Sequence, residues 1–469
     1  MLTAIAGHLH EVIDDTVGDD IRRAWIIIDL ALTYARGFIA DDVLLQGFKP
    51  LDRFEFREWL QRNGAQDQAV QSAVVQAFYD ASFSYADGRV DQPNVAAGVA
   101  IRATLRIIFG YVGHVVFKMN AGMGDTIFAP IYEVLKRRGV TFKFFRRVTG
   151  LEPGPVPGTS ARGIARVNLA RQVDLVGAEY QPLVTVNGLP CWPSRPLTDQ
   201  IQNGDRLAGV DLESRWSGWP DVGTETLEAG RDFDVLVLGI SLGALPFICQ
   251  PLLAEGEPKA AAWRALFDQV KTVRTQAVQI WTKETAAATG WGALGGITAC
   301  CDEPDASWAD FAQVLPREAW SPDAGVAGLF YGCGPMPDTD PPIPPPDDTG
   351  FPARMLASAA ATADAFLQRS AGPVWPSVSG PNGLDPGMVA SRYDRVNIDP
   401  SERYVLAVAG GEFAKLPPDG SGYSNLFLTG CWVDNGLNIS SVEGTVMAGL
   451  AAAAAVTGEP IRIVGAKDF

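Results

Sequence analysis

The order of apolar and polar positions predicts a chain built from both helices and strands. Apolar side chains recur at helical spacing over residues 22–38 and 54–62, and we expect helices there. Short apolar or alternating runs predict strands at 140–148, 234–238, 272–281 and 425–428. Residues 151–230 combine glycine, proline and short alternating runs, which is typical of β-hairpins. The sequence therefore predicts an α/β (α+β) fold.

The most informative stretch begins at the apolar run Leu426–Leu428, which predicts a buried strand. Gly430 then lets the backbone turn and pass close to another group. Ser440 and Glu443 have the spacing of a capping box, so we expect a helix of small residues over about 441–456. Its N-terminus presents unpaired N–H groups and a partial positive charge. Such an end suits an anion, or a ring that becomes anionic when it is reduced.

A second segment has the pattern of a turn, a helix and a strand. Glycines in 122–124 predict the turn, and Asp125 or Thr126 can cap the helix that follows. Gly139 is well placed to end this helix. The β-branched and aromatic residues from there to Val148 predict a strand. Taken alone, this is a common α–β unit and indicates no particular function.

Four segments in this order resemble the flavin amine oxidase and phytoene desaturase superfamily. The segments are 118–148, 231–243, 272–281 and 425–449, the last with Asn425 to Gly430, Gly436 to Asn438, Val442 to Gly444 and Gly449. In that superfamily the last strand–turn–helix covers the ribityl chain and the pyrimidine edge of FAD. The resemblance therefore implies FAD as the cofactor.

The resemblance also implies where individual residues lie along the cofactor. Gly430 and Cys431 would lie near the ribityl–pyrophosphate region, Asn438 and Ile439 would offer backbone groups to the pyrimidine edge, and Val148 would approach the adenine end. An acidic residue usually stands where this chain has Cys431. The expected cofactor-binding residues are Val148, Gly430, Cys431, Gly436, Asn438, Ile439, Glu443 and Gly444.

The same resemblance implies an amine oxidase-like organisation: an incomplete Rossmann-like FAD-binding lobe and a mixed sheet-and-helix substrate lobe. The expected parts are a helical part of the substrate lobe at 1–110, an FAD-lobe segment at 111–150, a β-rich insertion at 151–230, the return to the FAD lobe at 231–255, the substrate lobe at 256–410 with a proline-rich loop at 334–352, and the C-terminal FAD-lobe segment at 411–469.

One expected piece is missing from the sequence. The superfamily holds the FAD pyrophosphate with a strand, a Gly-x-Gly-x-x-Gly turn and a helix N-terminus. The match at Gly290–Gly295 follows no strand and starts no helix, so we expect a loop there. The chain thus resembles the C-terminal two-thirds of such a protein. We expect a separate N-terminal subunit that binds the FAD pyrophosphate, or a lobe lost through processing or a misplaced start codon.

Composition narrows the possible partners. The chain has 469 residues, of which 47% are hydrophobic and 20% charged, as in an ordinary globular enzyme. Its net charge of −16 disfavours nucleic acid and anionic membranes, because both attract basic surfaces. The apolar stretches 24–40 and 101–119 are interrupted by charge and do not predict membrane spans. They predict core helices or the walls of a pocket, which favours a small apolar or aromatic-bearing substrate.

The six cysteines and three histidines do not predict a metal site. The cysteines have no C-x-x-C spacing, His8 and His10 alternate along the chain, and Cys300 and Cys301 are adjacent. A reduced, cytoplasmic setting is the default for such a chain. The sequence also indicates no catalytic base. Lys118 and Lys283 are conceivable, but most lysines lie on the surface.

Two functions from different classes remain open. The first is an FAD-dependent oxidoreductase of amine oxidase or desaturase type, in which hydride passes from substrate to flavin and this chain is the C-terminal subunit or portion. The intact turn 436–438 favours it. The alternative is a non-catalytic subunit or gene fragment of that fold that binds no cofactor alone. Cys431 and the missing pyrophosphate-binding lobe favour the alternative.

Overall fold

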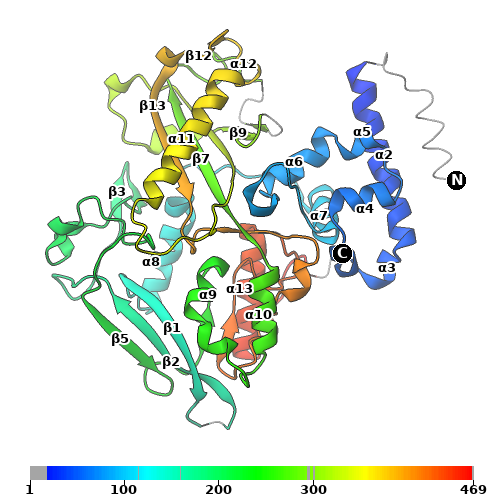
Figure 1. Ribbon diagram of the computed structural model, residues 1–469. Helices are drawn as coiled ribbons and strands as arrows, with labels where there is room; N and C mark the ends of the chain where they lie inside the picture. Colours follow the sequence, from blue (N-terminus) through cyan, green and yellow to red (C-terminus); the bar gives the residue numbers. More distant parts are fainter. Residues whose placement is uncertain (1–17, 115, 159, 293–295, 299–301, 467–469) are drawn as a thin grey trace.

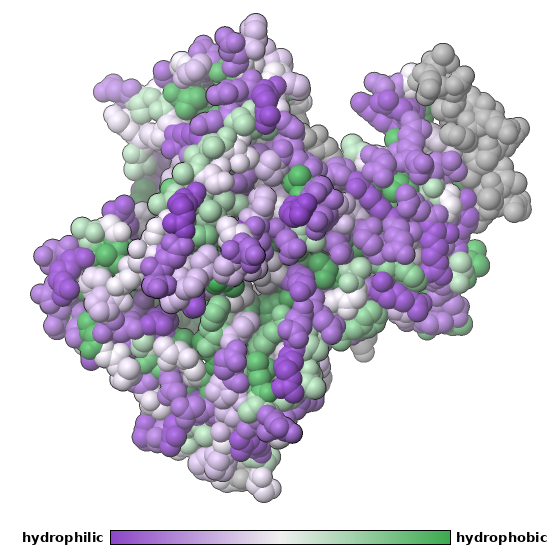
Figure 2. Space-filling view, in the orientation of Figure 1, coloured by the Kyte–Doolittle hydropathy of each residue, from purple (hydrophilic) through white to green (hydrophobic). Residues whose placement is uncertain are grey.

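The computed structural model describes residues 18–114, 116–158, 160–292, 296–298 and 302–466 (Figure 1). His8, His10, Cys300, Cys301 and residues 293–295 of the predicted Gly290–Gly295 loop lie outside the described residues. Four groups of elements follow one another along the chain: N-terminal helices, a β-rich part, an antiparallel central sheet, and a C-terminal strand and helix. The surface in Figure 2 is largely hydrophilic over the N-terminal helices and shows apolar patches at the lower centre, around α9 and α10.

The N-terminal part is helical, as the sequence predicts. Its helices are α2 (Asp19–Ala40), α3 (Val43–Gln46), α4 (Phe56–Arg62), α5 (Asp67–Val70), α6 (Ala73–Ala81) and α7 (Ala97–Leu105). They pack around a core that includes Trp59, Leu60 and Tyr79. Gly37 in α2 is required there, because a Cβ would lie 2.2 Å from Cζ2 of Trp59. Close packing of α2 on α4 therefore fixes this helical group.

An antiparallel sheet forms the centre of the molecule. Its strand order is β13-β7-β10-β9-β8, and β14 also pairs with β7. The strands are β7 (Thr272–Thr282), β8 (Ile297–Thr298), β9 (Ser307–Asp310), β10 (Gly328–Met336), β13 (Val389–Asn397) and β14 (Tyr404–Val405). Helices α11 (Phe351–Arg369) and α12 (Ala371–Val374) cover it, and Trp308, Phe330, Phe366 and Trp375 fill the core between them (Figure 1). A small hairpin, β11 (Ser379–Gly380) and β12 (Gly383–Leu384), follows α12.

The expected proline-rich loop at 334–352 is shorter than the sequence indicated. Residues 334–336 continue β10 and pair with Arg274–Gln276 of β7. Phe351 and Pro352 already begin α11, where proline is tolerated in the first turn. The loop therefore covers residues 337–350.

The β-rich insertion forms as predicted, although it starts earlier. An antiparallel sheet has the order β1-β2-β5, and β3 and β4 form a separate hairpin. These strands are β1 (Arg146–Pro155), β2 (Arg162–Arg171), β3 (Val184–Val186), β4 (Leu189–Cys191) and β5 (Gly223–Glu228).

The remaining elements surround a short parallel pair of strands. β6 (Leu236–Leu238) pairs with β15 (Leu426–Leu428), so the two segments that the sequence predicts for one sheet are neighbours. The nearby helices are α8 (Ala129–Arg137), α9 (Leu245–Ile248), α10 (Ala260–Gln269) and α13 (Val442–Thr457). Leu238, Trp263, Leu428 and Trp432 are buried in the core of this part. Figure 1 shows α9, α10 and α13 close together beneath the central sheet.

The strand expected at 140–148 is only partly formed. Residues 140–144 belong to no strand, and β1 begins at Arg146 and pairs with β2 instead of β6. Phe145 has φ of 57°, a left-handed conformation that redirects the chain before β1. Within the described ranges no neighbouring strand bonds to residues 141–144. The expected sheet of three segments is therefore a pair.

The helix around α8 ends where the sequence predicts, but its start has no side-chain cap. The helical region before α8 begins at Gly124, so neither Asp125 nor Thr126 caps it, and the Asp125 carboxylate accepts from Trp192 N at 3.0 Å. Gly139 ends the helix with φ of 85°, as predicted. Among the residues that the structure covers, no helix is long and apolar enough to cross a membrane.

Candidate functional site

The segment between β15 and α13 is a turn held together by its own side chains. Gly430, Gly436 and Asn438 have φ of 125°, 84° and 62°. Asn435 Oδ1 accepts from the N–H of Leu437 at 3.0 Å and of Asn438 at 2.8 Å. Asn438 Oδ1 in turn accepts from Asn435 N at 3.0 Å. These reciprocal amide bonds stabilise an irregular backbone that no regular element supports.

The turn leads directly into the N-terminus of α13. Ser441 is the N-cap, and its Oγ accepts from Gly444 N at 3.1 Å. The predicted capping box from Ser440 is wrong by one residue, because the Ser440 hydroxyl donates to Val405 O at 2.6 Å instead. The N–H groups of Val442 and Glu443 have no hydrogen-bond partner within the described part of the chain. Two donors at a helix N-terminus are thus available.

The Glu443 carboxylate is occupied by protein partners. Arg106 Nε donates to Glu443 Oε1 at 3.0 Å, and the Tyr111 hydroxyl donates to the other carboxylate oxygen. Arg106 Nη1 also donates to Gly465 O at 2.9 Å, so this arginine joins α13 to the C-terminal segment. Glu443 therefore offers its backbone N–H rather than its side chain to any group at the helix end.

The structure brings most of the expected residues to one region. Seven of the eight lie between Gly430 and Gly444, and Val148 and Cys431 pack against the same core cluster around Trp432. A Cβ at Gly430 would lie 2.9 Å from Trp432 Nε1, so only glycine fits at this close approach. Ile439 packs instead against the cluster of Ala96, Val99 and Ala407, which connects the turn to α7.

The donors of this region fit one end of FAD. Asn435 Nδ2 is buried and has no hydrogen-bond partner among the residues that the structure describes, and a Cβ at Gly444 would lie 3.4 Å from it. Together with the N–H groups of Val442 and Glu443, it offers donors suited to the carbonyl and nitrogen acceptors on the pyrimidine edge of a flavin. The region has no Gly-x-Gly-x-x-Gly turn to cradle a pyrophosphate. The described residues of this region fit the ring end of FAD, and among them none forms the glycine turn that would hold its diphosphate.

The two conceivable lysine bases are both engaged elsewhere. Lys118 Nζ donates to the carbonyl oxygen of Asp310, and Lys283 Nζ donates to Gly387 O at 2.8 Å. Neither bond involves the turn or the start of α13. In the described residues no cluster of three or more metal-ligating side chains is found.

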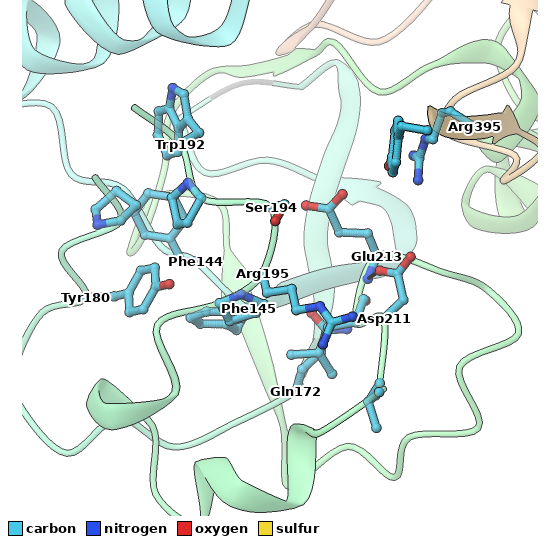
Figure 3. A pocket seen from close by; sticks show the side chains of 17 residues that line it. Phe144, Phe145, Gln172, Tyr180, Trp192, Ser194, Arg195, Asp211, Glu213 and Arg395 are labelled. Atoms are coloured by element: carbon cyan, nitrogen blue, oxygen red, sulfur yellow. Dashed lines mark hydrogen bonds between the residues drawn. The ribbon is translucent and has the colours of Figure 1, made fainter. Parts of the chain in front are cut away.

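A cavity of about 650 Å³ lies between the β-rich insertion and β13. Its aromatic wall comes from Phe144, Phe145, Tyr180 and Trp192, and the ring centroids of Phe145 and Tyr180 are 4.8 Å apart. Figure 3 shows Phe144, Tyr180 and Trp192 on one side and Arg395 of β13 on the other. Arg195, Asp211 and Glu213 supply charges of both signs. Sequence reasoning missed this cavity, because its lining comes from segments far apart in the chain.

Comparisons with known proteins bear on the fold. No protein-family model and no curated protein matches the sequence. Among solved structures, a triple mutant of putrescine oxidase has a TM-score of 0.50 at 9% identity, covering 95% of this chain and 78% of that chain. The chain has an amine oxidase-like fold.

Two other structures give weaker likenesses. Cyclohexylamine oxidase from Brevibacterium oxydans IH-35A has a TM-score of 0.47 at 12% identity, covering 95% of this chain and 76% of that one. An oxidoreductase from Methanosarcina mazei has a TM-score of 0.45 at 12% identity, covering 90% and 72%. Neither of these two likenesses reaches the similarity of the putrescine oxidase mutant, on which the amine oxidase-like fold rests. A shared fold does not by itself imply a shared function.

Proposed function

We propose that this chain is part of an FAD-dependent oxidoreductase of amine oxidase or desaturase type. The observation that carries the proposal is the set of unpaired donors at the turn: Asn435 Nδ2 and the N–H groups of Val442 and Glu443. They lie at the start of α13 in an amine oxidase-like fold. When bound, FAD supplies the chemistry, because its ring accepts hydride from the substrate.

The residues of the chain position this ring and surround it. Gly430 and Gly436 let the backbone approach closely, and Ile439 presents backbone groups to the pyrimidine edge. The expected role of Asn438 changes, because its N–H donates to Asn435 Oδ1 and its carbonyl accepts from Lys415 Nζ. The partial positive charge at the start of α13 stabilises negative charge on a reduced ring. Val148 and Cys431 contact the remainder of the cofactor from the shared core, and buried Gly444 lets α13 pack closely.

We also propose that a separate subunit supplies the lobe that binds the pyrophosphate. In the described part of the chain, the parallel sheet consists of β6 and β15. Val235, directly before β6, and Val237, within β6, are 42% and 48% exposed. Residues 140–144 lack a strand partner in the described chain, and Val140 and Phe142 are 43% and 36% exposed. Open strand edges with apolar side chains favour association. A strand, glycine turn and helix from a partner would fill both edges.

For the substrate, we propose a small apolar or aromatic-bearing molecule. Ile107, Ile108 and Phe109 are 43%, 60% and 70% exposed and directly follow Arg106, which is bonded to Glu443 at the start of α13. Apolar side chains beside the turn suit an apolar substrate. Lipophilic compounds should bleach the flavin under anaerobic conditions. Bleaching by small polar amines alone would contradict this proposal.

Co-expression with the product of the neighbouring gene tests the function and the partner together. Size-exclusion chromatography with absorbance at the flavin bands should give a complex that carries FAD. A stable monomer of this chain with stoichiometric FAD would contradict the separate subunit. A folded complex without any flavin would favour the non-catalytic alternative, to which the occupied Glu443 carboxylate and Cys431 already point.

A further inference from the structure

A buried lysine holds the backbone of the candidate turn. Lys415 Nζ donates to Asn438 O at 2.9 Å and lies 3.0 Å from Glu412 Oε2. The side chains of Lys415 and Glu412 are 1% and 0% exposed. Burying a charge is costly unless it is paired and hydrogen-bonded. Lys415 and Glu412 form a fully buried ion pair, and the lysine also donates a hydrogen bond to one carbonyl of an irregular turn. Such a costly arrangement indicates that the position of this carbonyl matters.

The turn is tied down at the same residue from a second side. Asn438 Nδ2 donates to Asp434 Oδ1 at 3.2 Å, and Lys49 Nζ donates to Asp434 Oδ2 at 2.6 Å. Asn438 has a positive φ, which asparagine tolerates better than most residues with a side chain. The bonds from Lys415 and to Asp434 hold it in this conformation.

A third acid completes the cluster from the N-terminal helices. Asp52 is buried, and its Oδ1 accepts from Val99 N at 3.0 Å. Burial, and then repulsion from Glu412, raise the pKa of Asp52 to about 7, while Lys415 and Lys49 oppose the rise. Burial also raises the pKa of Glu412, against the attraction of Lys415. The lysine thus faces two buried acids, Glu412 and Asp52.

We propose that Lys415 is a positioning residue for the cofactor, which fixes the carbonyl of Asn438 and so aims the backbone of Ile439 at the flavin edge, with Glu412 as its counter-ion. This inference rests on the proposed function. Backbone N–H groups held in a fixed direction by this bond would stabilise negative charge on the reduced ring.

The test compares two lysines that make the same bond. Lys259 Nζ donates to Gly420 O at 2.9 Å, away from the turn, so Lys259→Met is the matched control for Lys415→Met. Hydrogen exchange of peptides spanning 434–440 is measured on the full chain without flavin. Loss of a charged hydrogen bond should lower protection there about ten-fold or more in Lys415→Met, whereas Lys259→Met should leave it unchanged. Unchanged protection in a folded Lys415→Met chain overturns the inference.

A double variant and a measurement of the flavin reduction potential extend the test. If Lys415→Met does not fold, the double variant Lys415→Met/Glu412→Gln removes both charges and avoids an unpaired buried acid; it should show the same loss of protection. In the complex with the partner, Lys415→Met should lower the flavin reduction potential and Lys259→Met should not. Equal potentials in both variants overturn the positioning role. Absence of flavin from the wild-type complex contradicts the proposed function instead, while the exchange measurement still reports on the turn.

Discussion

Gly430, Gly436 and Asn438 show why single residues decide the geometry of the candidate site. Each has a positive φ within the short connection from β15 to α13. Gly430 is constrained by space, since Trp432 leaves no room for a Cβ, whereas Gly436 has its nearest neighbour at 3.6 Å. Substitution at Gly436 therefore meets backbone strain without a clash, which makes it the cleaner probe of the turn.

Replacing Gly436 with valine should abolish flavin retention and leave the fold largely intact. A β-branched residue at φ of 84° costs about 1–2 kcal/mol, which is small against the total stability but enough to reshape the turn. Gly458→Val is the control, because Gly458 has φ of 70°, has open space around it and lies at the far end of α13. Absorbance of the purified complex measures the outcome. A folded Gly436→Val protein with full yellow colour would show that the turn is not at the flavin.

Asp52→Asn should flatten part of the pH dependence of stability. Burial and Glu412 raise the pKa of Asp52 to about 7 in the folded chain, whereas the pKa of an aspartate in an unfolded chain is about 4. Between these two pKa values the folded state binds the Asp52 proton more tightly than the unfolded state does. The protonated Asp52 therefore contributes its full stabilisation of the fold below about pH 4, and this contribution is lost as the pH rises through about 7. The slope is at most about 1.4 kcal/mol per pH unit. Urea unfolding from pH 4 to 8 measures it, and parallel curves for both proteins would contradict the assignment.

At the scale of elements, the start of α13 combines two roles. The Ser441 cap stabilises the helix through Gly444 N, and the next two N–H groups remain available. The adjacent Ser440 is tied to strand β14 through Val405 O, and the Tyr404 hydroxyl donates to Ser440 O at 2.6 Å. The helix end is therefore fixed both by its own cap and by the central sheet.

Loss of the cap should weaken the helix modestly. Ser441→Ala removes the bond to Gly444 N and should lower the free energy of unfolding by about 1 kcal/mol. Ser72→Ala is a suitable control, because Ser72 caps α6 by accepting from Val75 N at 3.4 Å, away from the turn. Both variants should lose similar stability in urea unfolding, but only Ser441→Ala should weaken flavin binding. Equal flavin content in the two proteins would separate α13 from the cofactor.

At the scale of the whole molecule, the central sheet and the parallel pair of strands differ in how well they are covered. The central sheet is covered by α11 and has a filled aromatic core. The parallel pair of β6 and β15 is short, and Val235, directly before β6, and Val237, within it, are partly exposed. A two-stranded sheet is marginal by itself, so this part depends on the helices around it and on any partner that extends it.

A charged side chain on β6 should break the association with a partner subunit. Val237→Lys places a charge at a side chain that is 48% exposed and should change the stability of the isolated chain by less than about 0.5 kcal/mol. Val222→Lys is the control, since Val222 is 45% exposed and lies beside β5 in the β-rich insertion. Size-exclusion chromatography of the co-expressed proteins should show separation only for Val237→Lys. An intact complex with that variant would place the partner elsewhere.

The sequence predicted the elements whose signals are local. Leu426–Leu428 and the helix near Ser441 follow from an apolar run and a cap, and α2 follows from helical spacing over residues 22–38. Such signals depend on neighbours within a few residues. The resemblance to flavin enzymes supplied the expected fold, which the structure of putrescine oxidase supports.

Other features depend on contacts between distant residues, and only the tertiary structure decided them. The left-handed Phe145 sends β1 to β2, although the residues before it read as one continuous strand. Ser441 rather than Ser440 became the cap because Val405 captured the Ser440 hydroxyl. The cluster of Asp52, Glu412 and Lys415 joins the first helices to the last turn, and no pattern in the sequence indicated it. Charge pairing and burial depend on where the chain returns in space, which local periodicity does not encode.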